Sequence, residues 1–405
     1  MTKEKVIPQI RFSGFTDTWE QRKLSAIADK VTEKNVGLQY IETFTNSAEF
    51  GIISQRDFFD HDIAKMSSLG GYYIVRSEDF VYNPRISTSA PVGPINRNKL
   101  GRIGVMSPLY TVFRPHDIDT TYLEYFFKSK YWHSFMNFNG DSGARSDRFS
   151  IKDSVFFEMP IPIPHIDEQK KIGEYLAYLD RLITLHQRKY DKLTKVKKAM
   201  LEKMFPENGS PYPEIRFKGF TDAWKQRKFR EQYQKITEKN DLSFGADKII
   251  SVANMYFKSD VKQSDDDYMR SYNIMRLGDI AFEGNKSKHF AHGRFVENTI
   301  GDGIVSHVFD VFRPIADYDL LFWKYLINYE GVMGRIMTRC TKASTMMTNL
   351  VADDFLAESI LVPSIQEQQK IGAFLDKLDS LITLHQRKLE KLKNIKKACL
   401  EKMFV

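Results

Sequence analysis

The sequence lacks the features that mark secreted, membrane-spanning and zinc-binding proteins. Among 405 residues there are two cysteines, Cys340 and Cys399, too few for a framework of disulfides or a four-ligand zinc site. No apolar run reaches the roughly 18 residues that a membrane span needs, and the opening MTKEKVIPQIRF does not have the pattern of a secretory signal. We therefore expect a cytoplasmic protein with no membrane partner.

Motifs of catalysis are missing as well. The sequence has no GxxxxGK[ST] phosphate loop, no glycine-rich turn suited to a methyl-donor cofactor and no Ser, Cys or His in a recognisable nucleophilic motif. TyrAsnProArg from Tyr82 differs from the Asn-Pro-Pro-aromatic motif of adenine methyltransferases. The carboxylates at 265–267 favour a solvated acidic turn over a Mg²⁺ site, because spaced carboxylates converge better on one ion. We predict no catalytic residue, no metal and no cofactor.

What remains is the composition of a folded, basic protein. Hydrophobic residues make up 42% of the chain and charged residues 28%, and the net charge is +8. A chain of 405 residues exceeds the size at which a single hydrophobic core keeps growing, so two or more domains are expected. The positive charge favours an acidic partner, most commonly nucleic acid, although many basic proteins never bind DNA.

The most informative feature is an internal duplication. IRFSGFTDTWEQRK from Ile10 returns as IRFKGFTDAWKQRK from Ile215, and YTVFRP from Tyr110 returns as FDVFRP from Phe309. The longest repeat begins with PHIDEQKKIG at Pro164 and PSIQEQQKIG at Pro363, and both copies continue through LITLHQRK to LEKMF. Residues 35–107 and 240–306, which lie between these motifs, barely resemble each other. The pattern indicates two like scaffolds that carry two different blocks.

The repeated charged stretches predict two long helices. Each lacks proline, contains one glycine, and has apolar or aromatic residues mostly at alternating steps of three and four, the seam spacing of a coiled coil. Two like units in one chain pair most simply about a pseudo-two-fold axis, which makes the helices antiparallel and brings the C-terminal LEKMFV close to the N-terminal motif. The predicted seam residues are Ile172, Leu176, Leu179, Ile183, His186, Tyr190 and Leu193 in the first helix, and Ile371, Leu375, Leu378, Ile382, His385, Leu389 and Leu392 in the second.

Two groups of residues have competing interpretations. His186 and His385 occupy matching seam positions, where a hydrogen bond that fixes helix register is favoured over a metal pair or a pH switch. The aromatic stretches YLEYFF from Tyr122 and LFWKYL from Leu321 have helical spacing and lie in the like parts of the repeat. Core packing is therefore favoured for them over base stacking.

In this order, the motifs resemble the DNA-specificity subunit of type I restriction-modification systems. The resemblance covers essentially the whole chain and rests on the twin IRFxGFTDxW, PxIxEQxKI, LITLHQRK and LEKMF motifs. It implies an α+β fold in which two mixed α/β target-recognition domains, residues 1–165 and 206–364, are separated by two long antiparallel coiled-coil spacer helices, residues 166–205 and 365–405.

The same resemblance implies a function and partners. Each recognition domain would read one half of a bipartite, asymmetric target in double-stranded DNA, and the helices would set the spacing between the halves. The chain would be a non-catalytic subunit that docks two methyltransferase subunits and, for cleavage, the restriction subunits of the full complex.

Two polar loops in each half are candidate DNA contacts. Arg and Lys suit guanine and phosphate, while Asn suits adenine. The candidates in the first half are Asn83, Arg85, Ser87, Thr88, Arg97, Asn98, Lys99, Arg102, Arg145, Ser146 and Arg148. Those in the second half are Asn285, Lys286, Ser287, Lys288, His289, His292, Arg294, Arg339, Lys342, Ser344 and Thr345. For any single one of them, a solvated surface residue is an equally good interpretation.

Two other functions remain open at this point. The chain could be a fused or degenerate DNA methyltransferase or nuclease, which turnover by the chain alone would reveal. It could instead be a coiled-coil tether whose heads bind proteins, which DNA binding without salt dependence would favour.

Overall fold

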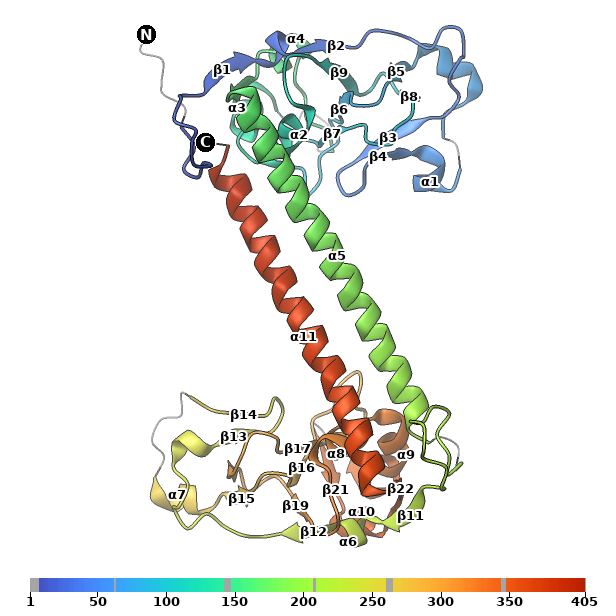
Figure 1. Ribbon diagram of the computed structural model, residues 1–405, viewed down its shortest axis with the longest axis vertical. Coiled ribbons are helices and arrows are strands. Elements are labelled where there is room, and N and C mark those ends of the chain that lie inside the picture. Colours follow the sequence, from blue (N-terminus) through green and yellow to red (C-terminus); the bar gives the residue numbers. More distant parts are fainter. Residues whose placement is uncertain are drawn as a thin grey trace. The chain divides into compact units, whose positions relative to one another are not determined.

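The computed structural model describes residues 7–61, 63–141, 147–206, 209–259, 265–343 and 347–404. The chain divides into two compact units, one formed by residues 1–187 and 387–405 and the other by residues 188–386. Each unit contains short strands and helices together with part of each of two long helices, α5 (Ile166–Met204) and α11 (Ile365–Lys402) (Figure 1). No helix among the described residues is long and apolar enough to cross a membrane.

The elements of the first unit lie between the N-terminus and α5. Its strands are β1 (Glu20–Lys23), β2 (Ala28–Lys30), β3 (Phe44–Ser47), β4 (Gly51–Ser54), β5 (Tyr73–Val75), β6 (Phe80–Tyr82), β7 (Ile95–Arg97), β8 (Gly104–Met106), β9 (Thr111–Pro115) and β10 (Pro160–Ile163). Its short helices are α1 (Gln55–Phe59), α2 (Thr120–Lys128), α3 (His133–Asn139) and α4 (Asp153–Phe156), with 3-10 turns at Leu24–Ala26 and Met66–Gly71.

The elements of the second unit lie between the two long helices. Its strands are β11 (Lys225–Lys228), β12 (Tyr233–Ile236), β13 (Ile250–Ser251), β14 (Tyr256–Phe257), β15 (Asn273–Met275), β16 (Ile280–Glu283), β17 (Arg294–Glu297), β18 (Gly303–Val305), β19 (Val311–Pro314), β20 (Thr341–Ala343), β21 (Thr348–Leu350) and β22 (Ser359–Val362). Its short helices are α6 (Phe229–Gln232), α7 (Asp266–Arg270), α8 (Leu320–Leu326), α9 (Glu330–Cys340) and α10 (Ala352–Ala357), with a 3-10 turn at Ala246–Lys248.

Both units are built on the same antiparallel sheet. Its order is β2-β9-β6-β7 in the first unit and β12-β19-β16-β17 in the second. The register agrees as well, because Phe80 pairs with both Arg97 and Phe113, and Ile280 pairs with both Glu297 and Phe312. The blocks that barely resemble each other in sequence therefore share one backbone plan.

The short repeat ending in PheArgPro supplies each sheet with an arginine that pairs with a buried aspartate. Arg114 on β9 donates two hydrogen bonds of 2.8 Å to Asp79, whose side chain also accepts one from the amide of Arg76. In the second unit Arg313 makes the same contacts with Asp279, at 3.0 to 3.3 Å. Each aspartate is 1% exposed, and removing its arginine would leave a buried charge unpaired. This pairing explains why the arginine is repeated.

The GluGlnxLysIleGly motif joins each long helix to its unit. The buried Glu168 accepts hydrogen bonds of 2.7 and 2.8 Å from Arg11, and Gln169 accepts one from the amide of Asp119, which caps α2. Gly173 follows at the point where α5 crosses α2, and a Cβ there would lie 3.1 Å from the backbone nitrogen of Tyr122. Glu168, Gln169 and Gly173 therefore each have a contact that a substitution would disturb.

The second unit repeats this joint. Arg216 donates hydrogen bonds of 2.8 Å to both carboxylate oxygens of Glu367. Gln368 accepts a hydrogen bond from the amide of Asp319, the cap of α8. A Cβ at Gly372 would lie 2.6 Å from the backbone nitrogen of Phe322. Equal contacts in both units account for the repetition of the motif.

Within each unit the two long helices pack in opposite directions. Ile172, Leu176 and Leu179 of α5 share a hydrophobic core with Cys399, Met403 and Phe404 from the end of α11. Asp180, further along α5, pairs with Lys396, which is earlier in α11, at 2.5 Å. In the second unit, Ile371, Leu375 and Leu378 of α11 share a core with Met204 and Phe205. The predicted antiparallel pairing and fold class are confirmed.

The remaining seam residues follow the same stripe. None of the predicted seam positions is exposed, and Leu389 is buried like the residues at the start of each helix. The chain end also lies where the repeat predicts, because the amide of Ile10 donates a hydrogen bond of 3.0 Å to the carbonyl of Lys402. The aromatic stretches form α2 and α8, and Tyr122, Phe126 and Trp323 are fully buried, so core packing is confirmed for them.

Leu176 and Leu185 offer a matched test of the helix packing, because they lie on one helix and only Leu176 is buried, at 0% exposure against 46%. Leu176→Ala leaves a cavity in the core and is expected to lower the free energy of unfolding by about 2–5 kcal/mol. Leu185→Ala is expected to change it by about 0.5 kcal/mol or less. Urea denaturation followed by circular dichroism measures both, and equal losses would contradict this assignment of core and surface.

Candidate nucleic-acid interface

The loop after the third strand of each sheet folds into the same turn in both units. In the first unit the amide of Ser87 donates to the carbonyl of Ala90 at 3.0 Å, and in the second Ser287 donates to Phe290 at 3.0 Å. Gly93 and Gly293 close the turn at φ of +84° and +75°, where a Cβ would lie 2.2 and 2.6 Å from a backbone oxygen. The backbone is thus fixed while the side chains differ.

In each unit the second predicted loop joins the first through a short antiparallel bridge. Arg85 faces Arg148 across this bridge, where the amide of Phe149 donates to the carbonyl of Pro84 at 2.7 Å. Asn285 faces Met347 in the second unit, where the amide of Thr348 donates to the carbonyl of Gly284 at 2.9 Å. The structure therefore brings together two segments some 60 residues apart, whose contact the sequence did not predict.

Many of the predicted contact residues form an exposed polar surface around these bridges. The exposed side chains are Arg85, Ser87, Thr88 and Arg148 in the first unit, and Asn285, Lys286, Ser287, Lys288, His289 and Lys342 in the second. Asn83 and His292 are half-buried, and the Asn83 amide donates to the carbonyl of Asn46 at 2.8 Å. Arg145, Ser146, Ser344 and Thr345 lie outside the described residues.

Besides Arg97, four of the predicted basic residues are paired with a carboxylate of their own unit. Arg102 binds Glu42, Arg294 binds Glu283 and Arg339 binds Glu358, each through a contact of 2.6 to 2.8 Å. Lys99 lies 3.2 Å from Glu124. Lys99, Arg102 and Arg339 remain about half exposed, so their charges still face solvent, whereas the Arg294 side chain is 27% exposed.

Arg97 and Asn98 lie inside the fold. The amide of Asn98, which is fully buried, donates to the carbonyls of Arg76 and Arg102. The Arg97 side chain is 9% exposed and lies 2.6 Å from Glu124 and 3.0 Å from Glu78. The two residues lie at the end of β7 away from the turn, and neither presents its side chain to a ligand on the turn.

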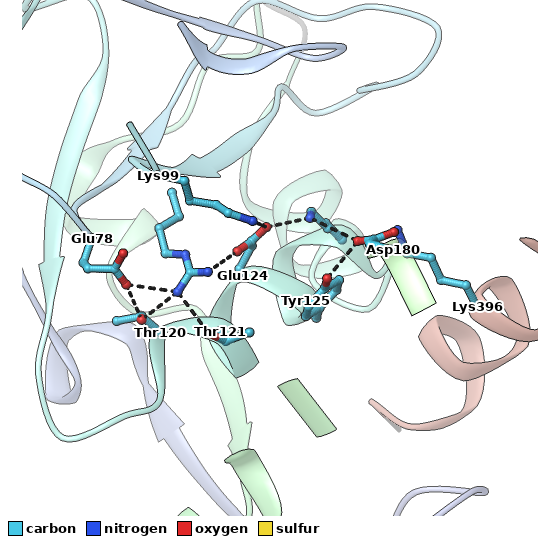
Figure 2. A network of polar contacts seen from close by, with 10 residues as sticks. Glu78, Lys99, Thr120, Thr121, Glu124, Tyr125, Asp180 and Lys396 are labelled. Carbon is cyan, nitrogen blue, oxygen red and sulfur yellow. Dashed lines mark hydrogen bonds and ion pairs between the residues drawn. The ribbon is translucent and has the colours of Figure 1, made fainter. Parts of the chain in front are cut away.

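The Arg97 contacts belong to a polar network that reaches both long helices (Figure 2). Glu124 on α2 also binds Lys128, and the hydroxyl of Tyr125 donates to Asp180 on α5 at 2.8 Å, where Lys396 of α11 also binds. Burial alone would raise the pKa of Glu124, but Lys128, Arg97 and Lys99 together lower the pKa below its ordinary value. Glu124 is therefore ionised and binds three cations.

The second unit has the opposite charges at the two corresponding positions. Glu297 stands where the first unit has Arg97, and Lys324 stands where it has Glu124. Lys324 pairs with Asp376 of α11 at 3.4 Å, and among the described residues neither carboxylate oxygen of Glu297 has a hydrogen-bond partner. Burial raises the pKa of Glu297 to about 10, against the influence of Lys324. The side chain is thus protonated at neutral pH.

Sequence reasoning missed Met347, which the structure places opposite Asn285 with 40% of its surface exposed. A usable signal was present, because Met347 follows Arg148 by the same offset that separates the repeated motifs. Among the described residues, no group of three or more His, Cys, Asp or Glu side chains is placed to hold a metal.

Comparison with known proteins identifies relatives along most of the chain. A model of the family described as type I restriction modification DNA specificity domain matches residues 17–195 and 207–394. The type I restriction enzyme MjaVIII specificity subunit of Methanocaldococcus jannaschii is 22% identical over 325 residues, which cover 74% of this chain and 73% of that protein.

Solved structures are similar over nearly their full length. The S subunit of a type I restriction-modification system from M. genitalium matches with a TM-score of 0.58 at 13% identity, over 98% of this chain and 99% of that one. The HsdS subunit from Thermoanaerobacter tengcongensis matches with a TM-score of 0.47 at 15% identity, over 95% and 96%. The likeness to the M. genitalium subunit shows a shared fold.

Glu297 gives the stability of the second unit a measurable pH dependence. The group has a pKa near 10 in the folded chain and about 4.3 when unfolded, so between these values only the folded chain holds the proton. The free energy of unfolding therefore falls as the pH rises through this window. Glu297→Gln removes this titration, so the variant should gain over the wild type by up to about 1.4 kcal/mol per pH unit between about pH 5 and 8 in urea denaturation.

Glu124→Gln is the matched control, because a lowered folded pKa contributes stability that is present above the unfolded pKa and lost as the pH falls. That variant should be less stable than the wild type near neutral pH. A difference between Glu297→Gln and the wild type that stays constant over the pH range would show that Glu297 is already paired.

Proposed function

The chain belongs to the type I restriction modification DNA specificity family, and from this premise we propose that its two recognition domains read the two halves of one bipartite DNA target. Specificity subunits of type I restriction systems are non-catalytic. The domains are taken as residues 1–165 and 206–364, and the spacers as residues 166–205 and 365–405. We propose that the target is asymmetric, because the exposed side chains of the two domains differ.

One observation carries this proposal. Two sheets of equal topology each present the same turn and the same bridge, and the exposed residues on that common backbone differ between the units. A scaffold that needed only to bind phosphate would have no reason to vary these positions, because phosphate contacts carry no sequence information. Varied polar side chains on a fixed backbone are what base readout requires.

The exposed residues are proposed to share the work of binding. Arg102, Lys286, Lys288, Lys342 and Arg339 supply positive charge near the loops and are suited to phosphate. Side chains on the bridge and the turn are suited to base edges. Arg97 and Asn98 contribute through contacts inside the fold, so their substitution is expected to affect folding before it affects base preference.

The long helices are proposed to set the distance between the half-sites. At about 1.5 Å per residue, the 39 residues of α5 are about 58 Å long, which exceeds the roughly 35 Å of one DNA turn. Their central solvent-facing surfaces, including the repeated ArgLys pairs at 188–189 and 387–388, are exposed and are proposed to dock two methyltransferase subunits. The restriction subunits would join through that complex.

Exchange of one recognition domain tests the proposal. The full chain, with a methyltransferase subunit of its system, is expected to select a two-part target from randomised duplexes, with affinity that falls steeply as salt rises. Replacing residues 206–364 by the corresponding block of another family member should change one half of that target only. Selection of no defined target, or a change in both halves, would contradict the two-domain assignment.

Insertion of one helical turn into both spacers tests their role. Four residues add about 6 Å, a little under two base pairs of about 3.4 Å. The target selected by the lengthened chain should keep both half-sites and gain one or two unread base pairs between them. A control with four residues inserted after Gly209, in the link between α5 and the second IRF motif, should keep the original gap. An unchanged gap in the lengthened chain would show that the helices do not set the spacing.

A further inference from the structure

We propose that the bridge positions, 85 and 148 in the first domain and 285 and 347 in the second, are the base-reading pair of each domain. Arg85 with Arg148 would select a G·C pair in one half-site, and Asn285 with Met347 an A·T pair in the other. The inference rests on the proposed function and assigns specific bases to specific side chains of that same surface.

The four positions are equivalent in backbone structure. Both bridges are antiparallel, both follow the third strand of the sheet, and both are held by a hydrogen bond from the residue after the second partner to the residue before the first. Each is a non-hydrogen-bonded pair, in which the two Cα atoms are only about 4.5 Å apart and both side chains project from the same face. The two neighbouring side chains can therefore contact the same small region of a ligand.

The first pair is electrostatically unfavourable without a ligand. Arg85 and Arg148 are both exposed, and like charges directly opposite each other in a ladder destabilise it. Lys30, which lines the same cavity as Arg148, is paired with Asp153. Within the described part of the chain, neither guanidinium of the bridge has an ion pair or hydrogen bond. Two adjacent guanidinium groups without a counter-ion favour a ligand that has several hydrogen-bond acceptors.

Guanine is the base that supplies such acceptors. Its major-groove edge presents O6 and N7, both acceptors, and an arginine fork binds them together. A phosphate would satisfy one guanidinium equally well, so the choice between base and phosphate depends on what stands at the same place in the other domain. There the side chains are not basic.

The second pair matches the other kind of base pair. Asn285 can donate to N7 and accept from the N6 amino group of adenine, and its amide is held only by a long contact of 3.4 Å to Glu283. Met347 beside it is 40% exposed, and an apolar side chain suits the methyl group of thymine. An amide with a thioether does not suit phosphate, so the equivalent positions are assigned to bases in both domains.

The test is base selection by the full chain with its methyltransferase subunit. Wild-type protein selects a target from randomised duplexes, and the double variant Arg85→Asn with Arg148→Met is then compared. It should lose preference at one G·C position of one half-site by about tenfold or more and move toward A·T there. The other half-site should stay unchanged, and thermal melting should show a folding midpoint no lower than that of the wild type, because the variant removes two opposed like charges.

The reciprocal change gives an independent gain of preference. Asn285→Arg with Met347→Arg should introduce a G·C preference into the second half-site only. Arg22→Ala, which removes a half-exposed arginine on β1 outside both loops, is the matched control and should leave the target unchanged.

The outcomes separate this inference from the proposed function. A wild-type chain that selects no defined target would overturn the proposed function itself. A defined wild-type target that both double variants also select would overturn the base-reading assignment alone. If the first double variant binds every sequence more weakly by the same factor, with a shallower salt dependence, Arg85 and Arg148 are phosphate contacts. That result would also overturn the base-reading assignment.

Discussion

The end of each long helix is buried in the core from which the other helix begins. Met403 and Phe404 of α11 complete the core around Leu176, and Met204 and Phe205 of α5 complete the core around Leu375. Neither recognition domain therefore has a complete hydrophobic core from its own residues alone. The ion pairs Asp180–Lys396 and Lys197–Asp379 fix the same antiparallel register in the two units. This shared burial makes each long helix part of both folds.

The two domains also show how one scaffold accommodates different sequences. The first has Arg97 paired with Glu124, and the second has Glu297 and Lys324 at the same positions. In the first arrangement a polar network runs from Arg97 on β7 to α5 and α11, as Figure 2 shows. In the second domain, Lys324 pairs with Asp376, and the buried Glu297 has no hydrogen bond to any described residue. Desolvation keeps Glu297 protonated. The second domain therefore has a neutral carboxylic acid at the position where the first domain has an arginine in an ion pair.

The surface proposed to read DNA depends on the division between buried and exposed polar residues. Arg97 and Arg85 are twelve positions apart and chemically identical, yet one is enclosed by Glu78 and Glu124 and the other projects from a bridge. The turn closed by Gly93 or Gly293 fixes the backbone, so exchange of side chains on it can alter the ligand without altering the fold. Affinity can then come from the surrounding cations and specificity from few residues.

The sequence by itself determined the duplication, the two long helices, their antiparallel pairing and the core role of the aromatic stretches around Tyr122 and Trp323. These follow from spacing and repetition, which are local and periodic signals. Only the tertiary structure decided which polar residues are available. Asn98 is a residue type that suits adenine, but its side chain is buried. Met347 was not among the predicted contacts, yet it lies opposite Asn285. Burial and cross-strand pairing are set by contacts between segments far apart in the chain, and no local pattern of residue types encodes them.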